Sequence, residues 1–557
     1  MVIKKDKFTR FLEILPGTLT WITLIGAPVL SYYHPAWIAI YIILFDMYWF
    51  LKGGNVAIHL MHSYYNLRTH QQIDWHDWIN RLSDRKQFQV ILENGANYTP
   101  TKRLKNLFNA QLERFKKTPS DRNLDYRRIY HLIILPAYQE SYSVLKSSIE
   151  SYLQSDYEKD RIIFVMAAEE RAGEEYKRNA LKLEQEYKDK FRLYLTVIHP
   201  DGIPGEAKGK GANIAYAGKA VKVKIDQQLG IAYEDIIVSA FDSDTLVHPN
   251  YFAHLTYDFL TIEKPHNASY QPMPMFHNNI WDTPAIARVI ATSSSFWQLV
   301  EASRPDRLVT FSSHSMSFKT LVDVGFWRTD LIPEDSHIFW QCWLHFNGDY
   351  RTQPLFTTVS MDAVLGDSYI GTLIAQYKQK RRWAWGVTEL SLVLPEVLKN
   401  RVIPNWKKFI YMERLVEGHY FWATASIMIA ILGWLPLMFG GDRFGESVLA
   451  VNLPALTRTL MSIATFFLIF SMYINMVLLP KRPARYPRWK TITMIIQWIF
   501  SPIVSSVFGS APAIDAQTRL MFGKYMEFWV TPKIRKFEAA NQAQQAQEVE
   551  KEGVHTK

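Results

Sequence analysis

Two aspartates one residue apart, Asp242 and Asp244, follow the short apolar run 236–240. In an extended chain, residues i and i+2 point to the same side, so both carboxylates can face one ligand. Paired carboxylates suit a hard divalent cation such as Mg²⁺ or Mn²⁺, whose remaining ligands are water and phosphate oxygens. A solvated turn can carry the same D-x-D sequence. The position directly after an apolar run favours a metal site that serves a diphosphate substrate.

A segment rich in glycine and lysine, residues 205–213, precedes these aspartates and contains Lys208 and Lys210. Flexible backbone and two cations suit a phosphate group or a carboxylate partner. The chain contains no G-x-x-x-x-G-K-[ST] sequence, so this segment is not a Walker A loop. A basic surface loop is the alternative interpretation.

Two further motifs lie closer to the C-terminus. Glu334-Asp335 precedes an aromatic, helix-like run, where a carboxylate can cap the helix or act as a general base. Residues 379–386 combine an amide, guanidinium groups and indole rings. Arginine binds phosphate in a bidentate manner, and a tryptophan face can stack on a sugar ring. A belt of Arg and Trp at a membrane surface is the alternative for this second motif.

The elements that must position these residues alternate along the chain from residue 126 to about 400. Apolar runs at 129–135, 162–166, 194–198 and 236–240 are separated by helix-like stretches at 144–153, 173–191 and 211–223. This alternation predicts a mostly parallel α/β sheet, in which ligands bind beyond the carboxyl ends of the strands. The residues that follow the runs, among them Glu140, Glu170 and Asp242, are therefore expected to gather at one edge.

Apolar windows flank this region on both sides. Three windows without charged residues, 420–440, 460–480 and 491–514, lie near the C-terminus, and two weaker windows, 14–30 and 36–51, lie near the N-terminus. A helix that crosses a bilayer needs about 20 apolar residues. The last window contains two prolines and has basic residues on both flanks, which predicts a membrane-dipping segment. We therefore predict four full spans and one segment that dips into the membrane.

These features divide the chain into five predicted regions. They are a transmembrane hairpin (1–52), an interfacial helical segment (53–125), the α/β domain (126–400), C-terminal transmembrane and interfacial helices (401–530) and a polar tail predicted to be disordered (531–557). Lysines and arginines before the first window place the N-terminus, and hence the α/β domain, in the cytoplasm of a plasma or inner membrane. The single cysteine, Cys342, excludes an internal disulfide and suits a reducing compartment.

The composition narrows the class of protein further. Charged residues make up 21% and hydrophobic residues 48% of the chain, which excludes wholesale disorder. The formal net charge of +10 would be compatible with a protein that binds nucleic acid. However, the basic residues crowd at the flanks of the membrane windows, where an anionic lipid bilayer explains them, so we expect no nucleic-acid partner.

The order of the motifs resembles that of the membrane-integrated family 2 glycosyltransferases, the group that includes cellulose, chitin and hyaluronan synthases. P-x-x-x-E, K-x-x-N, D-x-D, E-D and Q-x-x-R-W occur in that order, as Pro136…Glu140, Lys210…Asn213, Asp242…Asp244, Glu334-Asp335 and Gln379…Trp383. The resemblance covers roughly residues 126–400 and the arrangement of the flanking membrane segments. It implies a GT-A domain, a Rossmann-like α/β fold, inserted between N- and C-terminal transmembrane helices. It also implies inverting transfer from a nucleotide-sugar, with a UDP-hexose as the expected donor.

The resemblance also implies roles for individual residues. Asp242 and Asp244 would hold Mg²⁺ or Mn²⁺ against the diphosphate, and Asp335 would take the proton of the acceptor hydroxyl. The pyrophosphate and the acceptor sugar would be held by Gln379, Arg382 and Trp383. The donor would be contacted by Tyr138, Glu140, Glu170, Lys210 and Asp242. Glu169-Glu170-Arg171 departs from the aspartates that commonly end the family's second strand, which leaves the nucleotide open.

Several interpretations stay open at this point. The acceptor is a glycan or a lipid-linked sugar, and four spans leave a polymer channel narrow unless protomers assemble as a homo-oligomer. Residues 277–282 and 312–315 carry amide and hydroxyl groups that suit either sugar recognition or loop packing. A membrane nucleotidyl- or phosphosugar transferase would share the sheet and the metal carboxylates. A catalytically inactive membrane scaffold would explain the spans and leave the ordered motifs to chance.

Overall fold

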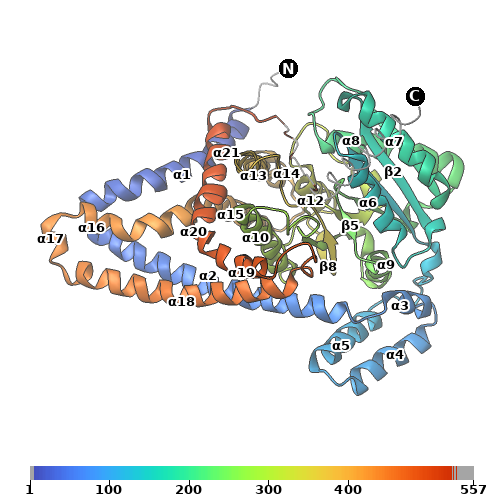
Figure 1. Ribbon diagram of the computed structural model, residues 1–557, viewed down its shortest axis with the longest axis horizontal. Helices are drawn as coiled ribbons and strands as arrows, with labels where there is room; N and C mark the ends of the chain where they lie inside the picture. The colour runs from blue at the N-terminus through green and yellow to red at the C-terminus, as the bar shows by residue number, and fades with distance from the viewer. Residues whose placement is uncertain (1–5, 528, 530, 532–534, 536–557) are drawn as a thin grey trace, which may run out of the picture.

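The computed structural model describes residues 6–527 together with residues 529, 531 and 535 (Figure 1). Long helices extend to one side of the molecule as an elongated bundle, and an α/β domain occupies the other side. The bundle contains α1 (Lys7–Tyr33), α2 (Pro35–His70), α15 (Asn405–Ile431) and α18 (Val448–Leu478). Pro35 stands in the first turn of α2, where the missing N–H has no intrahelical partner to lose.

An eight-stranded sheet forms the centre of the α/β domain, with the order β3-β2-β1-β4-β7-β6-β8-β5. The strands are β1 (Tyr130–Ala137), β2 (Ile162–Glu169), β3 (Leu193–His199), β4 (Ile236–Ala240), β5 (Leu246–Val247), β6 (Ala268–Met275), β7 (His314–Ser317) and β8 (Arg351–Ser360). The strands β3, β2, β1 and β4 run parallel, and β7 lies antiparallel between β4 and β6. The predicted α/β fold is confirmed, and the reversal at β7 makes the sheet mixed.

Helices cover both faces of the sheet. Ile133 and Leu135 of β1 pack in one core with α6 (Tyr142–Leu153) and α9 (Tyr251–Thr261). Leu132 and Ile134 face a second core with α8 (Lys210–Lys224) and α12 (Glu334–His345). A strand that is buried on both faces has apolar side chains at successive positions, so it appears in the sequence as a continuous apolar run. For this reason the parallel strands could be predicted from the sequence.

A small helical unit connects the first membrane helices to the sheet. It consists of α3 (Trp75–Arg81), α4 (Arg85–Tyr98) and α5 (Lys102–Lys116). Trp75 stacks on His254 of α9 with ring centroids 3.8 Å apart, and Trp78 packs against Tyr257 at 5.4 Å. Both tryptophans are buried. The α/β domain therefore covers the rings of Trp75 and Trp78, and the interfacial placement of the segment 53–125 stays a prediction.

Among the described residues, five helical stretches are long and apolar enough to cross a membrane: Lys7–Tyr33, Pro35–His70, Asn405–Phe439, Val448–Leu478 and Trp489–Met521. The last of them is interrupted, because α19 (Trp489–Ile496), α20 (Ser501–Ile503) and α21 (Ala511–Met521) are separated by a 3₁₀ turn and a π-helical segment. Its length and composition would allow a crossing, and the dipping course stays a prediction. The predicted polar tail falls almost entirely on residues 532–534 and 536–557, which lie outside the described residues.

Candidate active site

The D-x-D motif forms a turn directly after β4. The Asp242 N–H donates to Thr245 Oγ1 at 3.2 Å and to Ser313 Oγ at 3.3 Å, which ties the turn to the residues before β7. The Asp242 carboxylate remains 23% exposed, whereas Asp244 is fully buried. The two carboxylates therefore lie in different surroundings, with Asp242 on the open side of the site.

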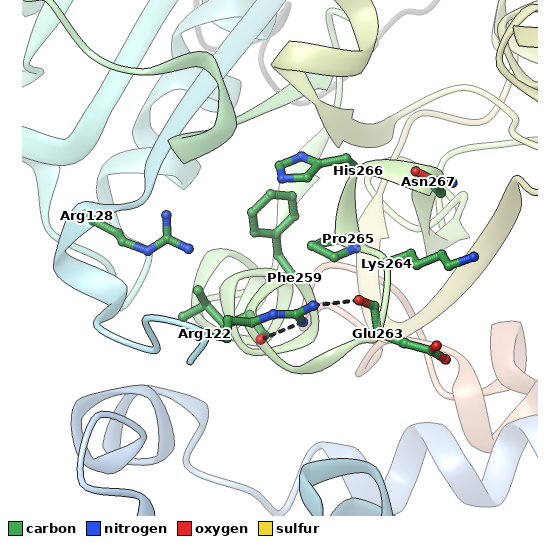
Figure 2. Close-up of a pocket in the computed structure, with 9 residues that line it drawn as sticks. Arg122, Arg128, Phe259, Glu263, Lys264, Pro265, His266 and Asn267 are labelled. Carbon is green, nitrogen blue, oxygen red and sulfur yellow. Dashed lines mark hydrogen bonds between the residues drawn. The ribbon is translucent and has the colours of Figure 1, made fainter. Parts of the chain in front are cut away.

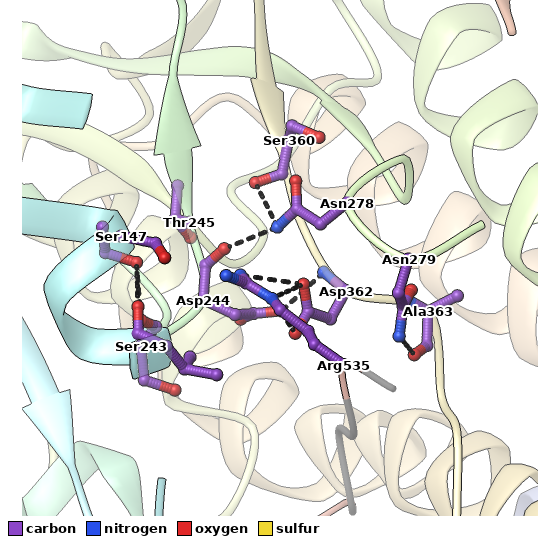
Figure 3. Close-up of polar contacts among 12 residues, drawn as sticks. Ser147, Ser243, Asp244, Thr245, Asn278, Asn279, Ser360, Asp362, Ala363 and Arg535 are labelled. Carbon is purple, nitrogen blue, oxygen red and sulfur yellow. Dashed lines mark hydrogen bonds and ion pairs between the residues drawn. The ribbon is translucent and has the colours of Figure 1, made fainter. Parts of the chain in front are cut away.

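Asp244 is held by the loop that follows β8, as Figure 3 shows. Its Oδ2 accepts the backbone N–H of Asp362 at 2.7 Å, and its carbonyl oxygen accepts Asn278 Nδ2 at 3.0 Å. The Asp362 carboxylate in turn pairs with Arg535, whose Nε lies 3.1 Å from both carboxylate oxygens. Neither Asp362 nor Arg535 belongs to a recognisable motif, so this contact could not be predicted from residue spacing.

Lys210 joins the D-x-D turn to the Glu334-Asp335 motif. Its Nζ lies 2.7 Å from Asp242 Oδ1 and 3.7 Å from Asp335 Oδ1. Burial of the ammonium opposes its charge, but the carboxylates of Asp242, Asp335 and Glu334 together raise the pKa of Lys210 above its ordinary value. Lys210 therefore stays charged at neutral pH and holds two acidic motifs side by side.

The first turn of α12 carries Glu334 and Asp335. The helix begins after Pro333, which makes no side-chain cap, so neither carboxylate is its N-cap residue. A Cβ at Gly211 would lie 2.9 Å from Glu334 Cβ and 2.9 Å from the Arg328 carbonyl oxygen, so the glycine permits α8 to approach this turn. Burial, and then the charge of Asp335, raise the pKa of Glu334 well above its ordinary value. Burial thus favours the protonated form of Glu334.

Asp335 is the carboxylate that remains accessible at this turn, with a side chain 29% exposed. Its backbone carbonyl oxygen accepts the Thr310 hydroxyl at 2.6 Å. Its Oδ1 makes no hydrogen bond to another described residue, although it faces the Lys210 ammonium. Oδ1 itself is buried, so an incoming hydroxyl group would reach the carboxylate from its exposed side.

The Q-x-x-R-W motif lies on α13 (Tyr369–Ala384). Gln379 is buried and accepts a hydrogen bond from Gln376 Nε2 at 3.1 Å, whereas Arg382 and Trp383 are half-buried. The Trp383 ring faces Phe276 with centroids 6.4 Å apart. Phe276 directly follows β6 and lies two residues before Asn278, which contacts Asp244. The indole therefore packs against the loop that also holds the second carboxylate of the D-x-D motif.

The predicted donor contacts at the ends of β1 and β2 divide into two groups. Glu140 accepts the Tyr138 N–H at 2.6 Å and the Ser243 hydroxyl at 2.9 Å, so its oxygens brace the D-x-D turn. Tyr138 lies under the Arg171 guanidinium, 4.5 Å from the ring centroid. Glu170 is 51% exposed and accepts the Asp201 N–H at 3.1 Å. Tyr138 and Glu170 therefore remain the more accessible of these residues.

Loop packing accounts for most of the polar residues between the D-x-D and E-D motifs. Asn279 donates to the Ala363 carbonyl at 2.9 Å, and Asp282 pairs with Arg485 at 3.2 Å and accepts the Tyr486 hydroxyl. The basic connector after α18 is thereby attached to the α/β domain. His314 is buried with its Nδ1 2.9 Å from the Phe311 carbonyl, and burial lowers the pKa of His314 to about 4. It is therefore a neutral neighbour of the site.

The residues at the D-x-D turn would suit a cation that is held jointly by the protein and a bound nucleotide. They would suit less well a cation held by protein ligands alone. Within the described part of the chain, no three His, Cys, Asp or Glu residues gather as a metal site. Asp242 and Asp244 supply two carboxylates, and diphosphate and water oxygens can complete the shell of a hard cation. This donor set fits Mg²⁺ or Mn²⁺ bound together with a nucleotide.

A separate cavity of about 320 Å³ lies at the opposite edge of the sheet, before β1 and β6 (Figure 2). Arg122 donates to the carbonyl oxygens of Leu260, Ile262 and Glu263, at the end of α9. Arg128 pairs with Asp235, and Lys264 pairs with Asp349. These cations are committed to contacts that hold the fold, and the cavity contains none of the motif residues.

Comparison with known proteins supports the interpretation of the motifs. A family profile described as "Glycosyl transferase family group 2" matches residues 237–480, which include the D-x-D, E-D and Q-x-x-R-W motifs. Over this segment, which is less than half of the chain, the protein is similar to family 2 glycosyltransferases. The mixed sheet, with its strand-end carboxylates, has the GT-A architecture expected for that family.

Solved glycosyltransferase structures show a weak overall similarity to the chain. The mannosyltransferase PcManGT from Pyrobaculum calidifontis, in complex with GDP-Man and Mn²⁺, is 15% identical, with a TM-score of 0.38 over 70% of this chain and 97% of that chain. S. aureus TarS 1–349 in complex with UDP-GlcNAc is 11% identical, with a TM-score of 0.33 over 72% and 95%. No curated sequence matches the glycosyltransferase. At these TM-scores the chain traces differ too much for residue roles to be transferred.

Proposed function

We propose that this protein transfers a sugar, with inversion at the anomeric carbon, from a nucleotide-sugar to a glycan or lipid-linked acceptor at the cytoplasmic face of a membrane. A UDP-hexose is the donor we expect. The observation that carries the proposal is the position of Lys210, 2.7 Å from Asp242 and 3.7 Å from Asp335. It unites the diphosphate-binding motif and the candidate base in one site, as direct transfer requires.

The chemistry needs one base and stabilisation of the leaving group. Asp335 accepts the proton of the acceptor hydroxyl while its oxygen forms a bond to the anomeric carbon, and the bond from that carbon to the diphosphate breaks. The electron pair of the broken bond leaves with the diphosphate, next to Lys210 and the Arg382 guanidinium. When bound, a divalent cation at Asp242 and Asp244 offsets the negative charge of that diphosphate. Trp383 supplies a flat apolar face on which the acceptor sugar stacks.

The membrane placement is part of the proposal. Apolar helices precede and follow the α/β domain, and they bring the site close to the ends of the bundle. Lys7 and Arg10 lie at the start of α1, and further basic residues lie in the connector between α18 and α19. This distribution favours a cytoplasmic location for the start of α1, for that connector and for the α/β domain between them. Assembly of protomers would widen the path available to a growing glycan.

The test uses the full chain in detergent or nanodiscs with a panel of UDP- and GDP-sugars. Nucleoside diphosphate release is measured with and without Mg²⁺ or Mn²⁺, and the product formed with added membranes is analysed by mass spectrometry. Metal-dependent diphosphate release together with a hexose added to an acceptor supports the proposal. Release of nucleoside monophosphate or pyrophosphate would instead identify a phosphosugar or nucleotidyl transferase. Silence with every donor and metal would favour a scaffold.

A further inference from the structure

A buried carboxylate outside the family motifs contacts the helix that begins with the candidate base. Glu389 is the first residue of α14 (Glu389–Lys399) and is 4% exposed. Its Oε2 accepts Trp340 Nε1 at 2.9 Å, and its Oε1 accepts the Ser336 hydroxyl. Both donors lie on α12, and Ser336 directly follows Asp335. The carboxylate therefore binds one face of the first two turns of α12.

Glu389 also lies close in sequence to the Q-x-x-R-W motif. The helix α13 ends at Ala384, one residue after Trp383, and the 3₁₀ turn Trp385–Thr388 leads directly into α14. A single side chain thus connects the segment that follows Arg382 and Trp383 to the segment that begins with Glu334 and Asp335. In the proposed reaction these two segments hold the diphosphate and acceptor sugar on one side and the base on the other.

Other contacts hold the faces of the first turn of α12 that do not meet Glu389. Thr310 binds the Asp335 carbonyl oxygen at 2.6 Å, and α8 approaches at Gly211 and Lys210. None of these contacts comes from the α13–α14 side. Farther along α12, Trp340 and Trp343 share a buried core with Val393 of α14, so loss of Glu389 would loosen the start of α12 and leave the rest of the helix packed.

We propose that Glu389 is a positioning residue, which holds the first turn of α12 against the α13–α14 segment so that Asp335 meets the acceptor hydroxyl. This inference rests on the proposed function, because it assigns Glu389 a role only if Asp335 acts as the base.

The electrostatics of Glu389 give this role a measurable signature. Burial raises the pKa of Glu389 to about 7, hydrogen bonds from Ser336 and Trp340 oppose the rise, and the charge of Asp335 adds to it. Asp335 on α12 is the charged group that acts on Glu389 among the described residues. On the bundle side, α15 places His419 beside Val387 and Leu390 of the same segment. The Glu389 carboxyl group therefore gains its charge as the pH rises through about 7, and Glu389→Gln removes that change.

The test compares Glu389→Gln, Ser336→Ala and the control Ser391→Ala in the full chain, with the donor on which the wild type is most active. Ser391 is also buried on α14, but its hydroxyl donates to the Thr388 carbonyl at 2.8 Å, within its own segment. We measure kcat, the KM for the donor, nucleoside diphosphate binding, the thermal midpoint and the pH profile of kcat/KM.

For Glu389→Gln we expect kcat to fall roughly 10- to 100-fold, because small misplacements of a base are costly, while donor KM and nucleoside diphosphate binding stay within about twofold. The wild-type profile of kcat/KM should change near pH 7, where Glu389 gains its charge, and Glu389→Gln should lack that change. Ser336→Ala should lower kcat less, about 3- to 10-fold, and should move the change near pH 7 to higher pH, because the hydrogen bond that lowers the pKa of Glu389 is lost. Ser391→Ala should match the wild type.

Each other result overturns the inference. Wild-type kcat and pH profile in Glu389→Gln would show that Glu389 does not position the base. An equal loss of kcat and diphosphate binding, together with a large fall in the thermal midpoint, would show a general structural role. Inactivity of the wild type with every donor would instead refute the proposed function itself, and that result is distinguished before any variant is compared.

Discussion

Replacement of Asp335 by asparagine separates the chemical step from the binding of the donor. Asparagine has nearly the same shape but cannot accept a proton at neutral pH. General-base assistance is typically worth about 10²–10⁴-fold, which corresponds to about 2.7–5.4 kcal/mol of transition-state stabilisation. We expect Asp335→Asn to lose turnover by at least the lower of these factors.

The structure indicates that the same substitution changes folding and donor binding little. The Asp335 side chain is 29% exposed and lies 3.7 Å from Lys210, a pair that contributes at most about 1 kcal/mol once solvent screening is considered. The shorter contact of Lys210 with Asp242, at 2.7 Å, does not involve Asp335 and should persist. The expected catalytic loss is therefore several times larger than any loss of stability.

The assay combines metal-dependent nucleoside diphosphate release with a direct measurement of nucleoside diphosphate affinity and the thermal midpoint. Asp335→Glu is the matched variant, because it keeps a carboxylate in a displaced position and should recover part of the turnover. Turnover in Asp335→Asn above about one tenth of wild type would remove Asp335 from the role of base. A parallel loss of diphosphate affinity would indicate that Asp335 serves donor binding instead.

Three further predictions follow from the site. Gly211→Ala should lower kcat and the thermal midpoint together, because its Cβ would lie 2.9 Å from Glu334 Cβ and from the Arg328 carbonyl; unchanged kinetics would show that the α8–α12 distance is not critical. EDTA should abolish diphosphate release, Mn²⁺ or Mg²⁺ should restore it, and Asp242→Asn should need more metal; full activity in EDTA would contradict metal dependence. Burial lowers the pKa of His314 from 6.5 to about 4, so below pH 6.5 the unfolded chain protonates first and stability falls by about 1.4 kcal/mol per pH unit. His314→Gln should flatten the acid dependence of the thermal midpoint, and an unchanged slope would exclude this contribution.

The apolar runs and the spacing of the motifs were sufficient to predict the parallel half of the sheet and the edge at which the chemistry lies. The strands β1 and β2 are buried on both faces and are therefore apolar throughout, a local pattern that is visible in the sequence. Asp242 and Asp244 follow such a strand, so their place at its carboxyl end followed directly. The two halves of the E-D motif could not be distinguished in this way, because their difference depends on burial.

Contacts between distant segments depend on the folded chain. Lys210 joins Asp242 to Asp335, Glu140 accepts the Ser243 hydroxyl, and Glu389 binds α12. None of these pairings follows from the periodicity of apolar residues in the sequence. Trp75 and Trp78 show why the sequence alone does not identify the partner of a helix. A helix with aromatic and polar residues suits both a bilayer surface and a protein interface. The spacing of apolar residues predicts which face of a helix or strand is buried. What covers that face, and which charge meets which, is set by packing among elements far apart along the chain.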